Sequence, residues 1–481
     1  MMVDSDDIII DTSRVRIYNS LSKKTELLSR DTSQTVGIYS CGPTVYDNIH
    51  IGNLFSFVVA DQLRRSIKIN GFDVIHVMNT TDVDDKTIKR ALTDFPNENP
   101  LDALKKVTTQ YESVFVEDAN KVGIDMQSIK LVRATKHIDQ MQNLIKTLLD
   151  KGIAYIADDG IYFKIEEYKK NHPYGVLTMI TEASTGHARV ANDEYDKDNV
   201  HDFALWKLQE PGEPAWDFEI EGKNLAGRPG WHIECSAMST EYLGQPFTIH
   251  TGGVDLKFPH HENEIAQSTG SNDKEFAEMF VHNEHVLVEG RKMSKSLGNF
   301  FTLRDIESKG FEPLAFRVLT LQSHYSHRLN FSWKSLQAAS AFLHRMYDFS
   351  DLQFQVNTEA KMLGDVISTT STKITQALAN NLDTAGALAE LSELMNIIES
   401  NLVNEEDSQD FVDLIAFIDR ALGLKLGSRH DIDENQKEMI QLRETARNSK
   451  DFASADEQRD RLKAEGITIR DTSLGPIWSR V

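Results

Sequence analysis

The spacing of apolar residues changes twice within the first 80 positions of the chain. Residues 35–40 are a short apolar run, residues 53–70 carry apolar side chains at helical spacing, and residues 73–78 are a second short run. This succession predicts a strand, a helix and a second strand. Gly71 stands where the cap of the helix belongs. The result is a predicted β-α-β unit whose first loop spans residues 41–53, and in such sheets ligands bind beyond the carboxyl ends of the strands.

The pattern after residue 299 is helical. Residues 405–407 are acidic and predict a loop between helices. Two apolar stripes at helical spacing predict a helical bundle in this half of the chain. Their members are Leu336, Ala339, Phe342, Leu343 and Met346 in the first stripe, and Leu388, Leu391, Leu394 and Ile398 in the second.

Composition narrows the class of protein. A chain of 481 residues has room for two to four domains, and 40% hydrophobic with 26% charged residues is typical of a soluble globular protein. No apolar run approaches the ~20 residues of a membrane span, and the acidic start is unlike a signal peptide. We therefore expect a cytoplasmic protein that does not bind membranes. Two cysteines exclude a disulfide framework.

Charge limits the contacts with nucleic acid. The net charge of −22 argues against a protein that coats nucleic acid without specificity. Residues 428–481 hold 10 Lys and Arg against 11 Asp and Glu, so this tail is nearly neutral. A solvated surface of mixed charge and a local contact face both fit that balance.

The first loop carries candidate phosphate ligands. His50, Gly52 and Asn53 stand at the start of the predicted helix, where free N–H groups and the positive end of the helix dipole attract phosphate. Gly52 permits close approach of a ligand, and the His50 imidazole can donate to a phosphate oxygen. A helix-capping turn with an incidental histidine would have the same sequence.

A second candidate is the segment Lys292-Met293-Ser294-Lys295-Ser296. Lys292 and Lys295 can close over a leaving pyrophosphate as mobile cations, with Gly290 and Gly298 as hinge points. An exposed basic loop is the alternative.

The two cysteines, Cys41 and Cys235, are candidate metal ligands that stand 194 positions apart in the chain. Pro259 opens a predicted helix that begins with His260 and His261, and Glu264 is four positions after the first of these and three after the second. Two thiolates, one imidazole and one carboxylate are a plausible Zn²⁺ site. Spacing alone does not choose between the histidines. A closed structural zinc site and two ordinary buried thiols remain alternatives.

The motifs together resemble those of the cysteinyl-tRNA synthetases, which are class I aminoacyl-tRNA synthetases. The resemblance runs from Val15 to Trp478. It is carried by the lysine segment and by Y-S-C-G-P-T-V-Y-D at 39–47, N-T-T-D-V-D-D-K at 79–86, G-R-P-G-W-H-I-E-C-S-A-M at 227–238 and F-P-H-H-E-N-E-I-A-Q-S at 258–268.

The resemblance implies an α/β Rossmann-like catalytic core with an inserted connective segment, followed by an α-helical bundle and a small C-terminal domain. The implied boundaries are 1–140 for the first half of the core, 141–225 for the connective insertion and 226–300 for the second half with the zinc site and the lysine loop. A stem-contact connector at 301–335, a tRNA-binding helical bundle at 336–427 and an anticodon-binding domain at 428–481 complete the chain.

The same resemblance implies that the chain joins L-cysteine to tRNA(Cys) through a cysteinyl adenylate, with ATP and Mg²⁺ as the activating pair, and that it acts as a monomer. Implied ligands of a single Zn²⁺ are Cys41, Cys235, His260 and Glu264. Implied cysteine-binding residues are Cys41, Thr81, Trp231 and His260. Implied ATP-binding residues are Gly42, His50, Gly52, Asn53, Asp255, Lys292 and Lys295, of which His50, Asn53 and the two lysines are catalytic.

Several of these roles have simpler readings. Trp231 also fits core packing, and Asp255 also fits an ordinary turn. Arg459, Arg461, Lys463 and Arg470 fit phosphate contacts or plain surface charge. Trp478 fits either base stacking or a packed anchor.

Two positions depart from the family pattern. Asn53 stands where many relatives have histidine, and its amide donates hydrogen bonds but carries no charge. Thr251 replaces the first of three glycines, which puts close approach of the nucleotide there in question.

Two other functions also fit parts of the sequence. A ligase that joins cysteine to a small amino-sugar acceptor would not need the bundle, and a noncatalytic regulator that binds RNA or zinc would not need His50 and both lysines.

Overall fold

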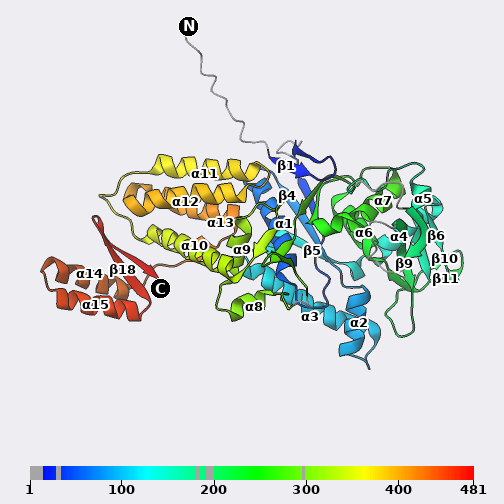
Figure 1. Cartoon of the computed structure of the whole chain (residues 1–481), viewed down its shortest axis with the longest axis horizontal. Helices are drawn as coiled ribbons and strands as arrows, with labels where there is room; N and C mark the ends of the chain where they lie inside the picture. The colour runs from blue at the N-terminus through cyan, green and yellow to red at the C-terminus, as the bar shows by residue number, and fades with distance from the viewer. Residues whose placement is uncertain (1–14, 29–33, 179–184, 191–199, 295–297, 481) are drawn as a thin grey trace, which may run out of the picture. The chain divides into compact units, whose positions relative to one another are not determined.

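The computed structural model describes residues 15–28, 34–178, 185–190, 200–294 and 298–480 (Figure 1). The chain divides into two compact units. The first comprises residues 1–313, 323–332 and 379–382, and the second comprises residues 314–322, 333–378 and 383–481.

A five-stranded parallel sheet forms the centre of the first unit, in the order β14-β13-β3-β4-β5. The chain adds β4 and β5 on one side of β3. It later adds β13 and β14 on the other side. The strand order therefore reverses between β3 and β13, which is the place where α/β sheets bind ligands. The strands are β3 Val36–Ser40, β4 Val74–Thr80, β5 Ile129–Arg133, β13 Phe247–Gly253 and β14 Ala277–Asn283.

The predicted β-α-β unit is present with small shifts of its ends. The strand predicted at 35–40 is β3, the helix predicted at 53–70 is α1 at Ile51–Ile69, and the strand predicted at 73–78 is β4. His50 caps α1, since its side chain accepts a hydrogen bond from the Asn53 amide. Gly71 has φ +90°, a conformation that favours glycine, just after the C-cap residue Asn70.

Helices flank this sheet and connect its strands. α6 packs on α7, and α4 packs on both (Figure 1). The helices of the first unit are α1, α2 Asp85–Asp94, α3 Pro100–Lys121, α4 Ile138–Asp150, α5 Ile165–Tyr168, α6 Trp231–Leu243, α7 His260–Asn272 and α8 Leu303–Ser308.

The inserted segment folds around a second sheet, in the order β12-β9-β7-β6, with β8 also paired to β9. Trp206 is fully buried there and its indole N–H donates to the Leu225 carbonyl. Its strands are β6 Ala154–Ile156, β7 Gly160–Phe163, β8 Thr185–Val190, β9 Val200–Leu208 and β12 Gly227–Pro229, beside the hairpin β10 Glu219–Ile220 and β11 Lys223–Asn224.

Two small sheets complete the first unit. The hairpin of β1 Arg16–Asn19 and β2 Lys24–Leu27 packs beside β14. A three-stranded sheet carries the start of the lysine loop, and its strands are β15 Val286–Val288, β16 Arg291–Lys292 and β17 Leu329–Phe331.

The second unit is helical and ends in a hairpin. Its helices are α9 Pro313–Leu321, α10 Trp333–Asp351, α11 Gly364–Ala379, α12 Thr384–Asn401, α13 Ser408–Leu422, α14 Glu434–Asn448 and α15 Phe452–Ala464, and its strands are β18 Ile467–Thr472 and β19 Gly475–Arg480. Both predicted apolar stripes are buried except for Phe342, which is half-buried. None of the described helices combines the length and the apolar character that a bilayer crossing requires.

Buried polar and aromatic contacts hold the end of the second unit. The Asp351 carboxylate, with no exposed surface, accepts hydrogen bonds from Arg429 and from Arg480. Trp478 is 5% exposed and packs among apolar side chains that include Leu462. A buried ring is not available to stack on a base, so the structure favours the packed anchor of the two interpretations of Trp478.

Candidate functional site

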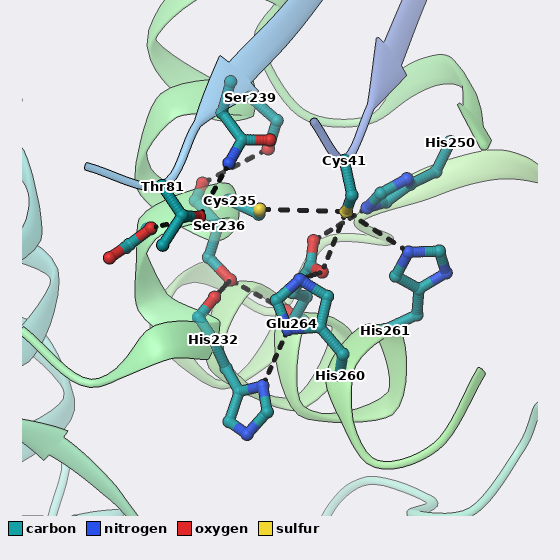
Figure 2. Close-up of polar contacts among 12 residues, drawn as sticks. Cys41, Thr81, His232, Cys235, Ser236, Ser239, His250, His260, His261 and Glu264 are labelled. Carbon is teal, nitrogen blue, oxygen red and sulfur yellow. Dashed lines mark hydrogen bonds and ion pairs between the residues drawn. The ribbon is translucent and has the colours of Figure 1, made fainter. Parts of the chain in front are cut away.

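Four side chains with metal-binding atoms meet beyond the carboxyl end of β3. Cys41 directly follows β3, Cys235 lies on α6, and His260 and Glu264 lie on α7. One donor atom from each lies within 4.8 Å of the others. The two sulfur atoms are 3.8 Å apart, and His260 Nε2 is 3.0 Å from Glu264 Oε1 (Figure 2). The sheet and two helices thus gather residues that are far apart in the chain.

A second group of donors overlaps the first. It consists of Cys41, Glu264, His250 and His261, whose atoms also lie within 4.8 Å of one another. His261 Nε2 is 3.4 Å from Cys41 Sγ, and His250 Nε2 is 2.7 Å from Glu264 Oε2. Both histidines that the sequence spacing left open therefore lie beside the same thiol.

The distances fit Zn²⁺ better in the first group. Bonds of ~2.3 Å from zinc to sulfur in a tetrahedral site place two sulfur atoms about 3.8 Å apart, which is the separation of Cys41 and Cys235. This group also supplies both thiolates, the ligands that zinc favours over carboxylate. Bonds of ~2.0 Å from a tetrahedral ion place nitrogen and oxygen ligands about 3.3 Å apart, and the 3.0 Å between His260 and Glu264 is closer to that than the 2.7 Å between His250 and Glu264 in the second group.

Burial controls the protonation of these donors. It raises the pKa of both cysteine thiols, that of Cys41 well above its usual value. It lowers the pKa of His260 to about 3 and holds that of His261 well below its ordinary value. The imidazoles are thus neutral, as ligands must be, whereas the thiols need a cation nearby to lose their protons.

Aromatic rings and histidines surround the cluster. Trp231, the first residue of α6, stacks on the His260 ring with centroids 4.2 Å apart. His260 Nδ1 is 2.8 Å from His232 Nδ1 (Figure 2). His261 contacts His282, which contacts Ser20. Such outer contacts fix the orientation of a ligating ring. Trp231 is half-buried, and its ring lies against His260 at the edge of the cluster.

A chain of hydrogen bonds joins the segments that carry the two cysteines. The Gly42 amide donates to Asn79 Oδ1, Asn79 Nδ2 donates to Thr81 Oγ1, and Thr81 Oγ1 donates to Glu234 Oε2. A side chain at position 42 would have its Cβ 1.7 Å from the Asn79 carbonyl oxygen, so only glycine fits. Thr81 thus lies between the neighbours of Cys41 and Cys235, and the predicted pocket residues lie together.

The two predicted ATP segments are adjacent. Phe301 O accepts a hydrogen bond from the Ile51 amide, which brings the chain after the lysine loop to the start of α1. A Cβ on Gly52 would lie 2.8 Å from His50 Nδ1 and 3.2 Å from Met293 Cε. Gly52 therefore makes room for the His50 ring and for the loop. Asn53 is exposed at the same helix end.

Asn299 ties the base of the lysine loop. Its side chain donates to the Lys292 carbonyl and accepts from the Ser294 amide. Lys292 is exposed at the end of β16. Gly290 and Gly298 both have positive φ, of +75° and +64°. Lys295 and Ser296 lie outside the described residues.

Asp255 and Thr251 lie at and beyond the end of β13. Asp255 is exposed in a short turn of helix, and a Cβ on Gly253 would lie 2.5 Å from its Oδ1. Thr251 is 2% exposed within the strand, and its carbonyl accepts the Cys41 amide. The threonine thus packs inside the sheet, and Gly252 and Gly253 follow it toward the edge.

Residues 27–341 match the model of a family described as tRNA synthetases class I (C), catalytic domain. Two relatives span nearly the whole chain, and both are called cysteine–tRNA ligase. The protein of Leptospira interrogans serogroup Icterohaemorrhagiae serovar Lai is 39% identical over 97% of this chain and 99% of its own length. That of Brachyspira hyodysenteriae is 39% identical over 96% and 98%. The chain belongs to the cysteine–tRNA ligase family.

Solved structures agree with the fold of this cysteine–tRNA ligase family member. Mycobacterium tuberculosis methionyl-tRNA synthetase in complex with methionyl-adenylate has a TM-score of 0.57 at 10% identity, over 82% of this chain and 93% of its own. The LeuRS-tRNA-LeuAMS complex of Agrobacterium radiobacter K84 has a TM-score of 0.59 at 11% identity, over 83% and 87%. The predicted Rossmann-like core followed by a helical region is confirmed.

Sequence reasoning missed several polar residues of the site in this ligase family member. Glu234 has no exposed surface and only one of its oxygens has a partner, which is unusual for a carboxylate. Asn79 and Asn299 hold loops through their amides, and His282 supports His261. Glu234 adjoins Cys235 and Asn79 opens the motif at 79–86, so their place in those strings was the available signal. No pattern marked Asn299.

Proposed function

We propose that the protein ligates L-cysteine to tRNA(Cys) through a cysteinyl-adenylate intermediate. The observation that carries this proposal is the position of the four-donor cluster and the two ATP segments at the carboxyl ends of β3 and β13, where the strand order reverses. The four-donor cluster would select the substrate thiol, and the ATP segments would activate the substrate carboxylate. The full-length match to relatives called cysteine–tRNA ligase supports the same reaction.

Cys41, Cys235, His260 and Glu264 would hold the zinc ion. Zn²⁺, when bound, supplies a soft Lewis acid that prefers a substrate thiolate to the hydroxyl of serine. The chain's own part is to shape the pocket. Trp231 walls one side through its stack on His260, and Thr81 is held in place by Glu234 and Asn79.

ATP would bind over the start of α1, with Mg²⁺ on its phosphates. The predicted contacts are Gly42, Gly52 and Asp255, with His50, Asn53, Lys292 and Lys295 on the reacting phosphates. A cysteine carboxylate oxygen attacks the α-phosphorus, and the bond from this phosphorus to the bridging oxygen of pyrophosphate breaks. The electron pair leaves with the pyrophosphate, whose charge the imidazole, the amide and the lysines stabilise.

The acyl group then moves to tRNA. A ribose hydroxyl of the terminal adenosine attacks the carbonyl carbon of the adenylate, the bond from this carbon to the phosphate oxygen breaks, and AMP leaves. The hydroxyl proton passes to the released phosphate or to water. Arg459, Arg461, Lys463 and Arg470 are exposed and stay candidates for phosphate contacts. The domain boundaries, a monomeric state and a cytoplasmic location stay predictions from the sequence.

Two assays test the proposal together. We expect exchange of labelled pyrophosphate into ATP that depends on cysteine, and charging of a tRNA pool with labelled cysteine. Absence of exchange would overturn the enzymatic proposal. Exchange without charging would favour a ligase with a small acceptor.

The metal is tested by replacing Cys235 with serine. Cys235→Ser should lose zinc and cysteine-dependent exchange together, because one of four donors is missing. Ser239→Ala, a change at a buried serine one turn further along the same helix, is the matched control and should retain both. A zinc-free variant that still selects cysteine over serine would refute the role given to the metal.

A further inference from the structure

A cavity of about 200 Å³ opens at the carboxyl ends of β4 and β5, which lie on the opposite side of β3 from β13. Its lining includes Asp82, which lies two residues after the end of β4, and Arg133, which is the last residue of β5. The volume is below the ~300–1,000 Å³ of clefts that enclose drug-sized ligands. The space therefore suits one small unit and not a whole ATP molecule.

Three cations line this cavity. Arg133 is held by a bidentate pair with Glu112, at 2.9 and 2.6 Å. Lys105 on α3 and Lys136 just after β5 are exposed, and neither forms an ion pair with a described residue. Two ammonium groups beside one cavity form an electrostatic site for a phosphate.

The wall of the cavity also offers an aromatic ring and fixed polar groups. Trp216 is half-buried, and its backbone pairs with Gly227 through two hydrogen bonds. Asp82 is 2% exposed and both its oxygens accept from Thr135, so it supports the cavity floor and is not a free negative charge. A held aromatic ring beside two lysines is the combination that binds a base and its phosphate.

The cavity adjoins an outer groove, and one of its lining residues neighbours the proposed cysteine pocket in the sequence. Asp82 directly follows Thr81, which lies in the hydrogen-bonded chain beside Cys235. A shallower depression of about 660 Å³ runs along α3 and shares Asp102 and Lys105 with the cavity. The cavity and the depression are therefore neighbours along α3, and Asp82, which lines the cavity, is next to Thr81 in the sequence.

We propose that this cavity binds one nucleotide of the single-stranded 3′ end of the acceptor RNA. Lys105 and Lys136 hold its phosphate, and Trp216 stacks on its base. The terminal adenosine then reaches the adenylate from the side of β4 and β5, while ATP occupies the side of β3 and β13. This inference rests on the proposed function, and a free nucleotide that places only one phosphate and its base in the cavity is the other source of the same chemistry.

The experiment compares two activities of the full-length enzyme with zinc bound. In Lys105→Ala/Lys136→Ala we expect the KM for tRNA in charging to rise about ten-fold. The slope of log kcat/KM against log salt should become shallower by about 0.7 for each lost phosphate contact. Cysteine-dependent pyrophosphate exchange, which uses no RNA, should stay at the wild-type rate.

The matched control is Lys24→Ala/Lys68→Ala. It removes two exposed lysines that do not line the cavity, one on the hairpin beside β14 and one in the last turn of α1. Its KM for tRNA and its salt slope should equal those of the wild type. Equal losses in both double variants would mean a general charge effect and would overturn the proposal.

Trp216 provides a second test that does not depend on charge. Trp216→Ala should raise the KM for tRNA about ten-fold, whereas Trp216→Phe should retain most of the affinity because it keeps a stacking face. A changed KM for ATP in the exchange assay would assign the cavity to free nucleotide and overturn the RNA site. An unchanged charging reaction in both the lysine and the tryptophan variants would also overturn it. Absence of exchange in the wild-type enzyme would refute the proposed function instead.

Discussion

Gly52 offers a direct test of how the two ATP segments work together. In Gly52→Ala the new methyl group would lie 2.8 and 2.9 Å from two atoms of the His50 ring and 3.2 Å from Met293 Cε. Contacts below 3.0 Å do not persist, so the ring must retreat by about 0.6 Å to reach an ordinary distance of 3.4 Å. The substitution therefore moves the imidazole without removing it.

The expected effects on stability and on rate differ. Alanine in a helix gains up to about 1 kcal/mol over glycine. A displaced ring would lose the hydrogen bond from the Asn53 amide to His50, 3.2 Å in the structure, which as a helix cap is worth ~1 kcal/mol. The free energy of unfolding should thus change little. A misplaced transition-state donor costs about 10²–10³ in rate, so pyrophosphate exchange should fall by that factor.

A double-mutant cycle shows whether the loss passes through His50. If it does, Gly52→Ala in a His50→Ala background should change the exchange rate by less than about two-fold, since the interaction is already gone. Gly270→Ala is the control, because this glycine lies in α7 and its Cβ would make only ordinary contacts of 3.4 Å or more. Wild-type exchange in Gly52→Ala, or additive losses in the double variant, would refute the reasoning.

Three further outcomes follow from buried polar groups. Asp351→Asn should lower the free energy of unfolding of the second unit by about 3 kcal/mol, because two guanidinium groups lose a buried counter-charge. Denaturant titration checks this, and Asp431→Asn, which changes a more exposed partner, should cost under ~1 kcal/mol. Burial lowers the pKa of His76 to about 3 in the folded protein, whereas the unfolded value is ~6.5, so stability is present above pH 6.5 and is lost as the pH falls. This residue should account for ~2 kcal/mol of the loss between pH 8 and pH 5, and a profile equally steep in His76→Asn would contradict that assignment. Glu234→Ala should raise the KM for cysteine about ten-fold with zinc retained, because the Thr81 hydroxyl loses its acceptor, and Glu234→Gln should be milder.

The parts of the fold that depend on local pattern could be predicted from the sequence. α1 has an apolar face, a capping histidine and a glycine after its end, so its position was within two residues of the prediction at each terminus. The apolar stripes of α10 and α12 are buried as their spacing indicated. Hydrophobic period and capping are local properties, and they need no knowledge of tertiary contacts.

The finer part of the site could not be predicted in this way. His260 and His261 are consecutive on α7, and both face the region of Cys41 because the start of this helix is buried all round. Helical spacing can single out one of two neighbouring residues as the inward-facing one only when the other face of the helix is polar. Glu234 reads as a surface carboxylate by composition, yet it has no exposed surface. Its burial depends on how α6 packs on the sheet, and a single sequence does not encode that packing in a readable period.

The distribution of the four donors along the chain has a consequence for the order of events during synthesis. Cys41 emerges early, whereas Glu264 follows it by 223 positions, after the entire inserted segment. At about 5–20 residues per second a ribosome would need roughly 10–45 s to pass from the first donor to the last. Until β13 has been made, shortly before Glu264, the nascent core has an exposed strand edge at β3. The complete donor set therefore forms at the moment when the two halves of the core join, so a measurement of metal capture by stalled nascent chains would report the assembly of this discontinuous domain.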